Sequence, residues 1–333
     1  MTIATTGAVS FSDLRTEFVG GSSAISFSDL YRGGSNSNIR TKAANNNAVN
    51  LAASVPTSGS ISVTNFRGAA KGFRFTFSSG ATNQNAATLF GDDYAVNYPK
   101  EIVINSGVEL GATSTSEEAL ELPSGGVGPI TVTNNGTLSG AGGAAGEDGG
   151  DAFETAVAVA VVNNGVIRAG GGGGGDGGMG SYESVNYQYQ YSPYTWMIRV
   201  YGGKVEVRWA GTRYINGYIG VNTTSYGQWR RGSYVATDST FVKYYVGQAS
   251  TVYSSGGVGG VGQGYNQAAG TGASGFNNAG DGGDGGSFGQ PGTDGANGNV
   301  LSGEVKGVAG NYIRGFSLLS SFSGSGSVQG GTA

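Results

Sequence analysis

The chain has 333 residues, of which 66 are glycine, nearly three times the ordinary share, and only 12% are charged. It has no histidine and no cysteine, which excludes disulfides, thiol nucleophiles, Cys/His zinc sites and Ser-His-Asp triads. A net charge of −4 gives no basis for nucleic-acid binding, and the longest apolar run, residues 156–162, is much shorter than the ~20 residues of a membrane span. We therefore expect a soluble protein without an export signal of its own, with no cofactor, no metal, no nucleic-acid partner and no membrane insertion.

Residues 1–72 contain a short unit three times, and in each unit a serine stands three residues before an Asp or Asn. The units begin at Ser10, Ser26 and Ser62. This spacing is a relative of the helix capping box, so we predict a short helical turn in each unit. The turns can end in a left-handed conformation at the glycines that follow them, Gly20-Gly21, Gly33-Gly34 and Gly68. The segment is interpreted either as an internal mini-domain or as a docking segment on another protein.

Residues 73–180 alternate strand-like segments with glycine tracts. Phenylalanines recur with period two from Phe73 to Phe77, as in a half-buried strand. Three extended segments broken by Asn-Gly or Ser-Gly start near residues 103, 132 and 162. Their spacing of about 29 residues indicates stacked equivalent strands rather than isolated hairpins. The alternation from Ala156 to Val161 predicts a further strand, apolar on both faces and buried between layers.

Glycine recurs with period three in four tracts, at residues 140–149, 171–180, 256–262 and 280–298. A three-residue repeat is that of the polyproline II helix, in which glycine on one face lets two backbones touch. Collagen shares the repeat but needs abundant proline, and the longest tract has only Pro291. We therefore predict a bundle of polyproline II helices, in which the unbroken glycines 170–175 lie on a helix surrounded on every side. The acids of the tracts should face outward; they are Glu147, Asp148, Asp151, Asp176, Asp281, Asp284 and Asp294.

Residues 181–253 hold most of the 18 tyrosines and all 3 tryptophans, and they are basic, whereas the remainder of the chain is acidic. Tyrosines alternate with glutamines at 187–191, and apolar residues alternate with charged ones at 205–209, which predicts an antiparallel sheet with turns at Gly202-Gly203 and Asn216-Gly217. About half of the aromatics are needed for a core, and the others stay outside, where Tyr, Trp and Arg are typical of binding hot spots. An anionic glycan would suit such a surface. The candidate receptor-binding residues are Tyr187, Tyr189, Tyr191, Tyr194, Trp196, Trp209, Tyr226, Trp229, Arg230, Arg231 and Tyr234.

Two features resemble known proteins. The run Val9 to Arg15 and its second copy, Ile25 to Gly34, resemble the N-terminal segment of bacteriophage tail-fibre and tail-tip proteins, which implies that residues 1–72 attach the chain to the virion. The candidate attachment residues are Phe11, Leu14, Arg15, Phe18, Phe27, Leu30, Tyr31 and Arg32. The period-three tracts resemble the glycine-rich receptor-binding adhesins at the distal end of tail fibres of T-even-like phages. That resemblance implies an attachment domain, stacked polyproline II helices, and receptor specificity in the loops between them.

These features together predict a mainly β protein with a bundle of glycine-rich polyproline II helices, short N-terminal helices and an inserted antiparallel β subdomain. The predicted parts are an attachment segment, the two halves of the glycine-rich body and the aromatic insert, at residues 1–72, 73–180 with 254–333, and 181–253. The predicted function is that of a phage tail adhesin, made in the host cytoplasm and carried on the virion beside other tail proteins. Its insert would bind a glycan or an outer-membrane protein of the bacterium.

Alternatives stay open at this stage. A purely structural tail protein, whose insert contacts another virion subunit, would have the same sequence features. A glycan-cleaving enzyme would need paired carboxylates, and the insert has only Glu183, Glu206 and Asp238, widely separated, so we predict no enzymatic activity. An ice-binding bundle would need a flat Thr/Ala face, which the acids of the tracts argue against. Phage fibres are commonly threefold, whereas related adhesins cap a fibre as single copies, and we favour a homotrimer.

Overall fold

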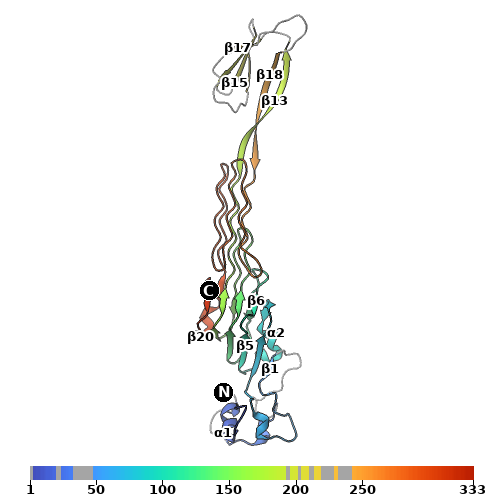
Figure 1. Cartoon of the computed structure of the whole chain (residues 1–333), viewed down its shortest axis with the longest axis vertical. Coiled ribbons are helices and arrows are strands. Elements are labelled where there is room, and N and C mark those ends of the chain that lie inside the picture. The colour runs from blue at the N-terminus through green and yellow to red at the C-terminus, as the bar shows by residue number, and fades with distance from the viewer. Residues whose placement is uncertain are drawn as a thin grey trace.

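The computed structural model describes residues 3–19, 24–32 and 48–333, apart from residues 193–195, 202–203, 210–213, 219–228 and 232–241 and the side chains of residues 185–249. The protein is mainly β and elongated (Figure 1). A small N-terminal module lies at one end, and a three-sided parallel β-solenoid follows it. A bundle of extended glycine-rich segments rises from the solenoid and carries an antiparallel sheet at its far end.

The N-terminal module is built from the three repeated units. Each unit forms the predicted helical turn, and the first turn runs on into one π-helical turn: α1 (Phe11–Leu14), η1 (Arg15–Val19), η2 (Phe27–Leu30) and η3 (Val63–Phe66). All three capping boxes are present, because Ser10, Ser26 and Ser62 each exchange hydrogen bonds with the Asp or Asn three residues later. Gly68 follows the third turn with a φ of +70°, as predicted, whereas the two Gly-Gly pairs lie outside the described residues.

The three units share one hydrophobic core, which is separate from that of the solenoid. Leu14, Phe18, Leu30 and Phe66 are fully buried in it, and the rings of Phe18 and Phe66 lie with their centroids 5.8 Å apart. Each unit supplies only one or two large side chains, so a single unit cannot bury a core by itself. The units therefore fold by packing on one another.

The solenoid passes through three sheets in the same order in every turn, and equivalent strands of successive turns stack in parallel. Sheet 1 contains β1 (Val49–Asn50), β2 (Phe73–Phe77), β5 (Lys100–Ile104), β8 (Ile130–Asn134), β11 (Val159–Asn163) and β20 (Leu319–Ser323), of which only β1 is antiparallel to its neighbour. Sheet 2 contains β3 (Ala81–Thr82), β6 (Glu109–Gly111), β9 (Thr137–Ser139), β12 (Val166–Arg168) and β21 (Ser327–Gln329). Sheet 3 contains β4 (Gln84–Asn85), β7 (Leu120–Leu122), β10 (Phe153–Thr155), β19 (Asn311–Arg314) and β22 (Gly331–Thr332). Short helices lie in the connections: α2 (Ala86–Phe90), η4 (Gly91–Ala95) and η5 (Phe316–Leu318).

The predicted stacking of the Asn-Gly segments is confirmed. Strands β5, β8 and β11 pair in parallel, so that Val132 lies opposite Ile102 on one side and Val161 on the other. At the ends of these strands the buried Asn134 donates from Nδ2 to Oδ1 of Asn163 at 2.9 Å, one turn further on. These asparagines lie at the corner between sheet 1 and sheet 2. Each strand pairs with the equivalent strand of the next turn rather than with a neighbour across a hairpin.

The expectation that residues 156–161 form a strand buried on both faces was wrong. Strand β11 begins at Val159, and only alternate side chains, including Val159 and Val161, are fully buried. Each sheet of the solenoid has one face toward the shared core and one toward the outside. The period-two pattern of Phe73 to Phe77 follows the same rule, and the predicted half-buried strand is β2.

The bundle is an insertion at one corner of the solenoid. The connection from sheet 2 to sheet 3 lengthens over the first four turns: it is residue 83, then residues 112–119, then 140–152, then 169–310, whereas in the last turn it is residue 330 alone. The third and fourth connections supply all of the glycine tracts and the aromatic insert. The solenoid therefore forms the foundation from which the bundle rises (Figure 1).

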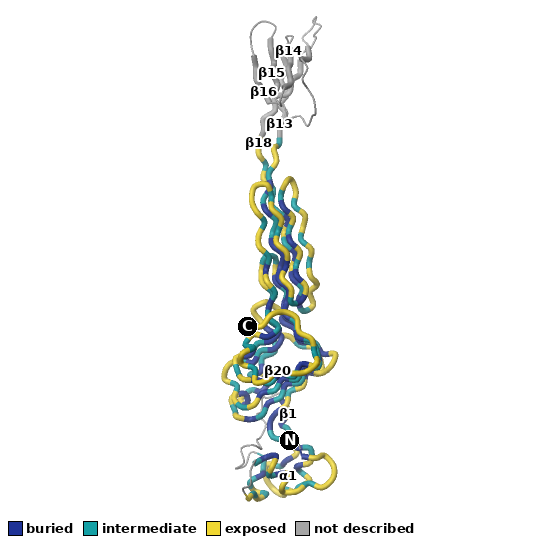
Figure 2. The backbone as a smooth tube through the Cα atoms, turned by 90° about the vertical axis from the view of Figure 1, so that its left-hand side faces the viewer, coloured by how far each residue is buried: buried dark blue, intermediate teal, exposed yellow. Residues whose placement is uncertain are grey.

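Residues 169–180 form the central segment of the bundle. Its backbone N–H and C=O groups bond to the segments around it, residues 140–146, 147–150, 257–263, 280–286, 290–296 and 304–310. These bonds recur every third residue, for example from the N–H groups of Gly171, Gly174 and Gly177 to one neighbour. Adjacent outer segments also bond to one another, so they close a ring. Figure 2 shows the buried residues along the interior of this ring.

A side chain on the central segment would collide with a neighbouring backbone. A Cβ on Gly173 would lie 1.7 Å from the carbonyl oxygen of Ala144, and one on Gly174 would lie 1.9 Å from that of Gly283. Every residue from 170 to 175 is in this position, so each of these unbroken glycines lies directly against a neighbouring backbone. The packing of backbone on backbone here takes the place of side-chain burial.

The ring ends on one side where segment 140–150 turns back, at Gly146 with a φ of +72°. Gly170 and Gly173 face segment 140–150. Asp176 and Met179 occupy the next two positions on the same face of the central segment, and both are half-buried. This face of the central segment therefore carries side chains only beyond the point where segment 140–150 ends.

The acids of the tracts bond to backbone N–H groups at the bundle surface. The pairs, with the carboxylate as acceptor, are Asp148 with Val308, Asp151 with Asn311, Asp176 with Gly259, Asp281 with Gly275, Asp284 with Gly272 and Asp294 with Lys306. Most of the seven acids are exposed as predicted, while Asp151 and Asp176 are half-buried. The backbone N–H bond from Lys306 lowers the pKa of Asp294. The carboxylates accept hydrogen bonds from backbone N–H groups of the outermost segments, which would otherwise bond to water.

Candidate functional site

The insert begins where the central segment of the bundle ends. Strand β13 (Gly180–Ser192) follows directly from it and pairs antiparallel with β18 (Val242–Ser254) along its whole length. The described strands between them are β14 (Trp196–Tyr201), β15 (Lys204–Trp209), β16 (Tyr214–Tyr218) and β17 (Trp229–Arg231). All belong to one antiparallel sheet, in the order β13-β18-β16-β15-β14-β17, so the predicted antiparallel subdomain is confirmed. The sheet lies at the end of the molecule opposite the N-terminal module (Figure 1).

The foot of the insert is fixed by asparagines of the distal turns. Asn278 and Asn299 both donate from Nδ2 to the carbonyl oxygen of Ser181, at 2.9 and 3.1 Å, and Asn299 Oδ1 accepts the N–H of Ser181 at 2.8 Å. On the other strand, Asn277 donates to the hydroxyl of Ser254 at 3.2 Å. These bonds attach both strands of the β13–β18 pair to the rigid end of the bundle.

Apolar side chains are exposed around this foot. Phe276 is 73% exposed, Tyr253 63% and Leu301 55%, and Val300 and Tyr182 are also exposed. We call these five residues the distal surface. Exposed aromatic and aliphatic side chains favour contact with another molecule.

None of the five is among the predicted site residues: Tyr182 and Tyr253 lie within the predicted binding region 181–253, whereas Phe276, Val300 and Leu301 lie outside it. The available signal was the interruption of the glycine period at residues 276–279 and again at 299–301. Both interruptions contain asparagine, and Asn277 and Asn278 adopt positive φ angles of 53° and 66°. An interruption of this kind marks a turn, and turns of a bundle lie at its ends.

The predicted receptor-binding residues fall on the strands of the insert. Tyr187, Tyr189 and Tyr191 lie on β13, Trp196 on β14, Trp209 on β15, and Trp229, Arg230 and Arg231 on β17. The backbone register places Trp196 opposite Trp209 and Ile198 opposite Arg230. Tyr194, Tyr226 and Tyr234 lie outside the described residues. The structure thus brings most of the predicted residues into one sheet.

One predicted turn of the insert was wrong. Asn216 and Gly217 lie inside β16, where Gly217 pairs with Val205 of β15. The Asn-Gly pair has strong turn propensity, but here strand pairing on a longer scale determines its conformation. The other predicted turn, Gly202-Gly203, lies outside the described residues.

The predicted attachment residues divide into two groups by exposure. Leu14, Phe18 and Leu30 are completely buried in the module core. Phe11 is 41% exposed, and Phe27, Arg15, Tyr31 and Arg32 are half-buried. The hydroxyl of Tyr31 donates to the carbonyl of Gly59, and Nε of Arg32 donates to that of Val55. Only part of the predicted set is therefore available at the surface of the module.

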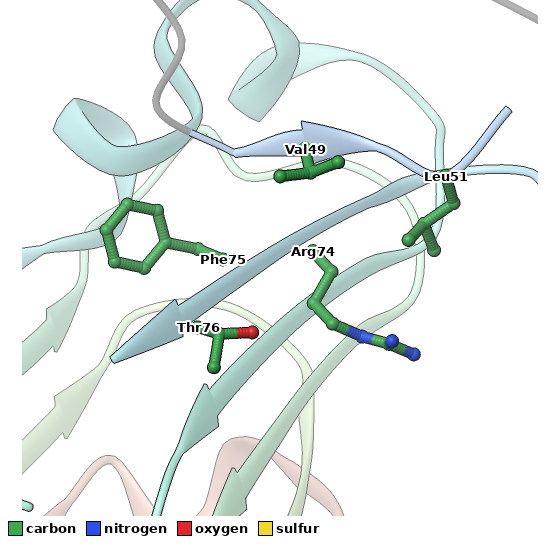
Figure 3. Close-up of a pocket in the computed structure, with 5 residues that line it drawn as sticks. All are labelled: Val49, Leu51, Arg74, Phe75 and Thr76. Carbon is green, nitrogen blue, oxygen red and sulfur yellow. The ribbon is translucent and has the colours of Figure 1, made fainter. Parts of the chain in front are cut away.

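A hollow of about 520 Å³ lies at the edge of sheet 1, lined by Val49, Leu51, Arg74, Phe75 and Thr76 (Figure 3). Strand β1 is only two residues long and pairs with Phe73 and Arg74, so it leaves the rest of β2 uncovered. Nε of Arg74 donates to Oε2 of Glu101 at 2.6 Å. The hollow is the gap beyond a short edge strand, and it lies on the solenoid rather than at the distal surface.

A carboxyl group with a strongly shifted pKa lies in the connection just before strand β7 of sheet 3. Glu118 is only 8% exposed; its burial, together with the negative charge of Glu154, raises its pKa to about 7. Arg314 forms ion pairs with both glutamates and with Asp151. In the described part of the chain, no group of acids is arranged to hold a metal ion, and no helix is long and apolar enough to cross a membrane.

The shifted pKa predicts a stability that depends on pH. The pKa of Glu118 is 4.5 in the unfolded chain and about 7 in the folded protein, so the folded state binds more protons between these limits. The free energy of unfolding should therefore fall as pH rises from 4.5 to 7, and this contribution should be constant above that range. Thermal midpoints of Glu118→Gln should lose this dependence, whereas Glu117→Gln, altered at the exposed neighbour, should keep it. An unchanged profile in Glu118→Gln would assign the pH effect to another group.

The solenoid and the bundle form a stalk that carries an antiparallel sheet and exposed apolar side chains at its distal end, an arrangement typical of a binding protein. Comparison with protein families identifies it further: the model of the phage tail fibre adhesin Gp38 family matches residues 72–333, and the chain belongs to this family. The match begins just before β2 and covers the solenoid, the bundle and the insert. The protein is accordingly a phage tail-fibre adhesin and a component of the virion tail. Neither the curated proteins nor the solved structures gave a match.

Proposed function

We propose that the adhesin attaches to the tail through residues 1–72 and binds a glycan or an outer-membrane protein of the bacterium through residues 181–253, assisted by the distal surface. The observation that carries the proposal is the placement of a basic, aromatic-rich sheet at the opposite end of the molecule from the N-terminal module (Figure 1). A receptor-binding region must extend away from the virion, and the long axis of the molecule supplies that separation.

Binding without chemical change to the receptor is the mechanism that this arrangement favours. Tyrosine, tryptophan and arginine supply large contact areas with few rotatable bonds, so that little conformational entropy is lost on binding. The foot of the insert is held by the hydrogen bonds of Ser181, which lowers the ordering cost further. We propose that no covalent step is catalysed.

The glycine-rich segments are proposed to be polyproline II helices. Their hydrogen bonds recur every third residue, and their glycines touch neighbouring backbones at the same interval. Backbone dihedral angles from a crystal structure of the protein would test this assignment. Values near those of a β-strand, φ about −120° or beyond, would contradict it.

The adhesin function is tested by staining a broad panel of bacterial isolates with fluorescently labelled full-length protein. Selective staining of some isolates is expected, and it should be lost when the cells are stripped of the receptor class, by periodate for glycans or by protease for outer-membrane proteins. Folded protein that stains none of the isolates would favour a purely structural role, in which the insert contacts another virion subunit.

The homotrimer remains a proposal that light scattering would test. Each hydrophobic core of the described residues is completed within one chain. A mass near the 33.4 kDa of a single chain would contradict the trimer and would indicate a single copy that caps the fibre.

A further inference from the structure

The N-terminal module lies almost wholly outside the family match, which begins at residue 72. It nevertheless has a hydrophobic core of its own, built around Leu14, Phe18 and Phe66. A separately folded module that is joined to the family's body is a candidate for a separate binding function. Its surface should then carry a site with recognisable chemistry.

Such a site lies between the first and second repeats. Phe11 and Phe27, at equivalent positions of their units, form an edge-to-face pair with ring centroids 4.5 Å apart. Beside them is a pocket of about 300 Å³, lined by Phe11, Ser12, Arg15, Ala24 and Ile25. The pocket therefore combines apolar walls with one cationic side chain.

The guanidinium of Arg15 carries a donor that the described residues leave unused. Its Nε atom is buried and has no hydrogen-bond partner among the described residues. A buried donor without a partner destabilises the fold, and more so when its group is charged. Arg15 as a whole is half-buried and lines the pocket, so a carboxylate that enters the pocket would pair with the charge of its guanidinium.

We propose that this pocket is the virion docking site, and that it binds an acidic side chain flanked by an apolar residue on another tail protein. The inference rests on the proposed function, because it names the site and the ligand chemistry of the tail attachment. The apolar neighbour would pack on Phe11 and Ile25 while the carboxylate pairs with Arg15.

The other repeats do not carry the same feature. In the third unit the residue equivalent to Arg15 is Arg67, which is exposed to solvent. In the second unit the equivalent residue is Tyr31, whose hydroxyl is bonded to the carbonyl of Gly59. Repetition of the sequence therefore gives a matched control, since Arg67 is an arginine at the same repeat position outside the pocket.

The test uses virions that lack this protein, incubated with purified full-length protein and then sedimented. Arg15→Gln should reduce the bound protein by about tenfold or more, since a charged hydrogen bond is lost. Arg67→Gln should bind as the wild type does. Thermal midpoints show whether either variant is damaged, and Arg15→Gln should be at least as stable as the wild type. Normal uptake of folded Arg15→Gln would overturn the proposal.

The ligand chemistry has a second test in solution. Titration of the full-length protein with 3-phenylpropionate should shift the Arg15 Nε–H resonance, whereas 3-phenylpropanamide, of the same shape without charge, should not. Equal shifts with both compounds would reject the carboxylate. Neither experiment depends on the bacterium, so a failure of cell staining would count against receptor binding alone and would leave the docking result readable.

Discussion

Replacing Gly173 by alanine is expected to unfold the bundle while leaving the N-terminal module intact. The new Cβ would lie 1.7 Å from the carbonyl oxygen of Ala144, and the surrounding atoms are backbone, which cannot move aside as a flexible side chain can. The central segment is bonded on all sides, so a local shift would break hydrogen bonds to several segments at once. The expected loss exceeds about 3 kcal/mol, the upper end of ordinary overpacking. Thermal unfolding and protease digestion would measure it.

The matched control for this variant is Asp176→Ala, three residues further along the same face. There the covering segment has ended, so an alanine meets no backbone, and only the bond from Asp176 to the N–H of Gly259 is lost. A loss of about 1 kcal/mol is expected. If Gly173→Ala proved as mild as Asp176→Ala, the ring around the central segment would be looser than the hydrogen bonds indicate.

The features that could be predicted from the sequence are those encoded locally or by a fixed period. A capping box is complete within four residues, so the turns at Ser10, Ser26 and Ser62 followed from the sequence alone. A spacing of about 29 residues indicated stacked strands, because a solenoid requires one turn per repeat. The enclosed glycines 170–175 could also be predicted, since only a segment without an open face excludes every side chain.

The remaining features depend on contacts between distant parts of the chain. That the whole bundle arises from one corner of the solenoid could not be predicted, because β12 and β19 are neighbours in the turn but lie on either side of residues 169–310. The exposure of Phe276 and Leu301 depends on which ends of the bundle the turns occupy. Asn216 and Gly217 show the same limit, since pairing with β15 overrides a strong turn signal.

Shortening the insert is expected to abolish receptor binding and to leave the body folded. Ser184 and Ser250 lie opposite each other in the β13–β18 pair, so residues 185–249 can be replaced by Asn-Gly, which suits a two-residue hairpin turn. The asparagine bonds to Ser181 and Ser254 remain, because both serines lie outside the replaced segment. The thermal midpoint of the body should therefore be unchanged.

Staining of receptor-bearing cells by the shortened protein should fall by about a hundredfold or more, since hot-spot residues typically contribute 2 kcal/mol or more each. The companion variant Phe276→Ser, with the insert intact, should lose only part of the signal, because it alters the distal surface alone. If the shortened protein still stained cells and Phe276→Ser did not, the turns of the bundle would be the receptor site and the insert an accessory. If binding survived in both but the shortened protein failed to join the virion, the insert would have to contact another tail subunit.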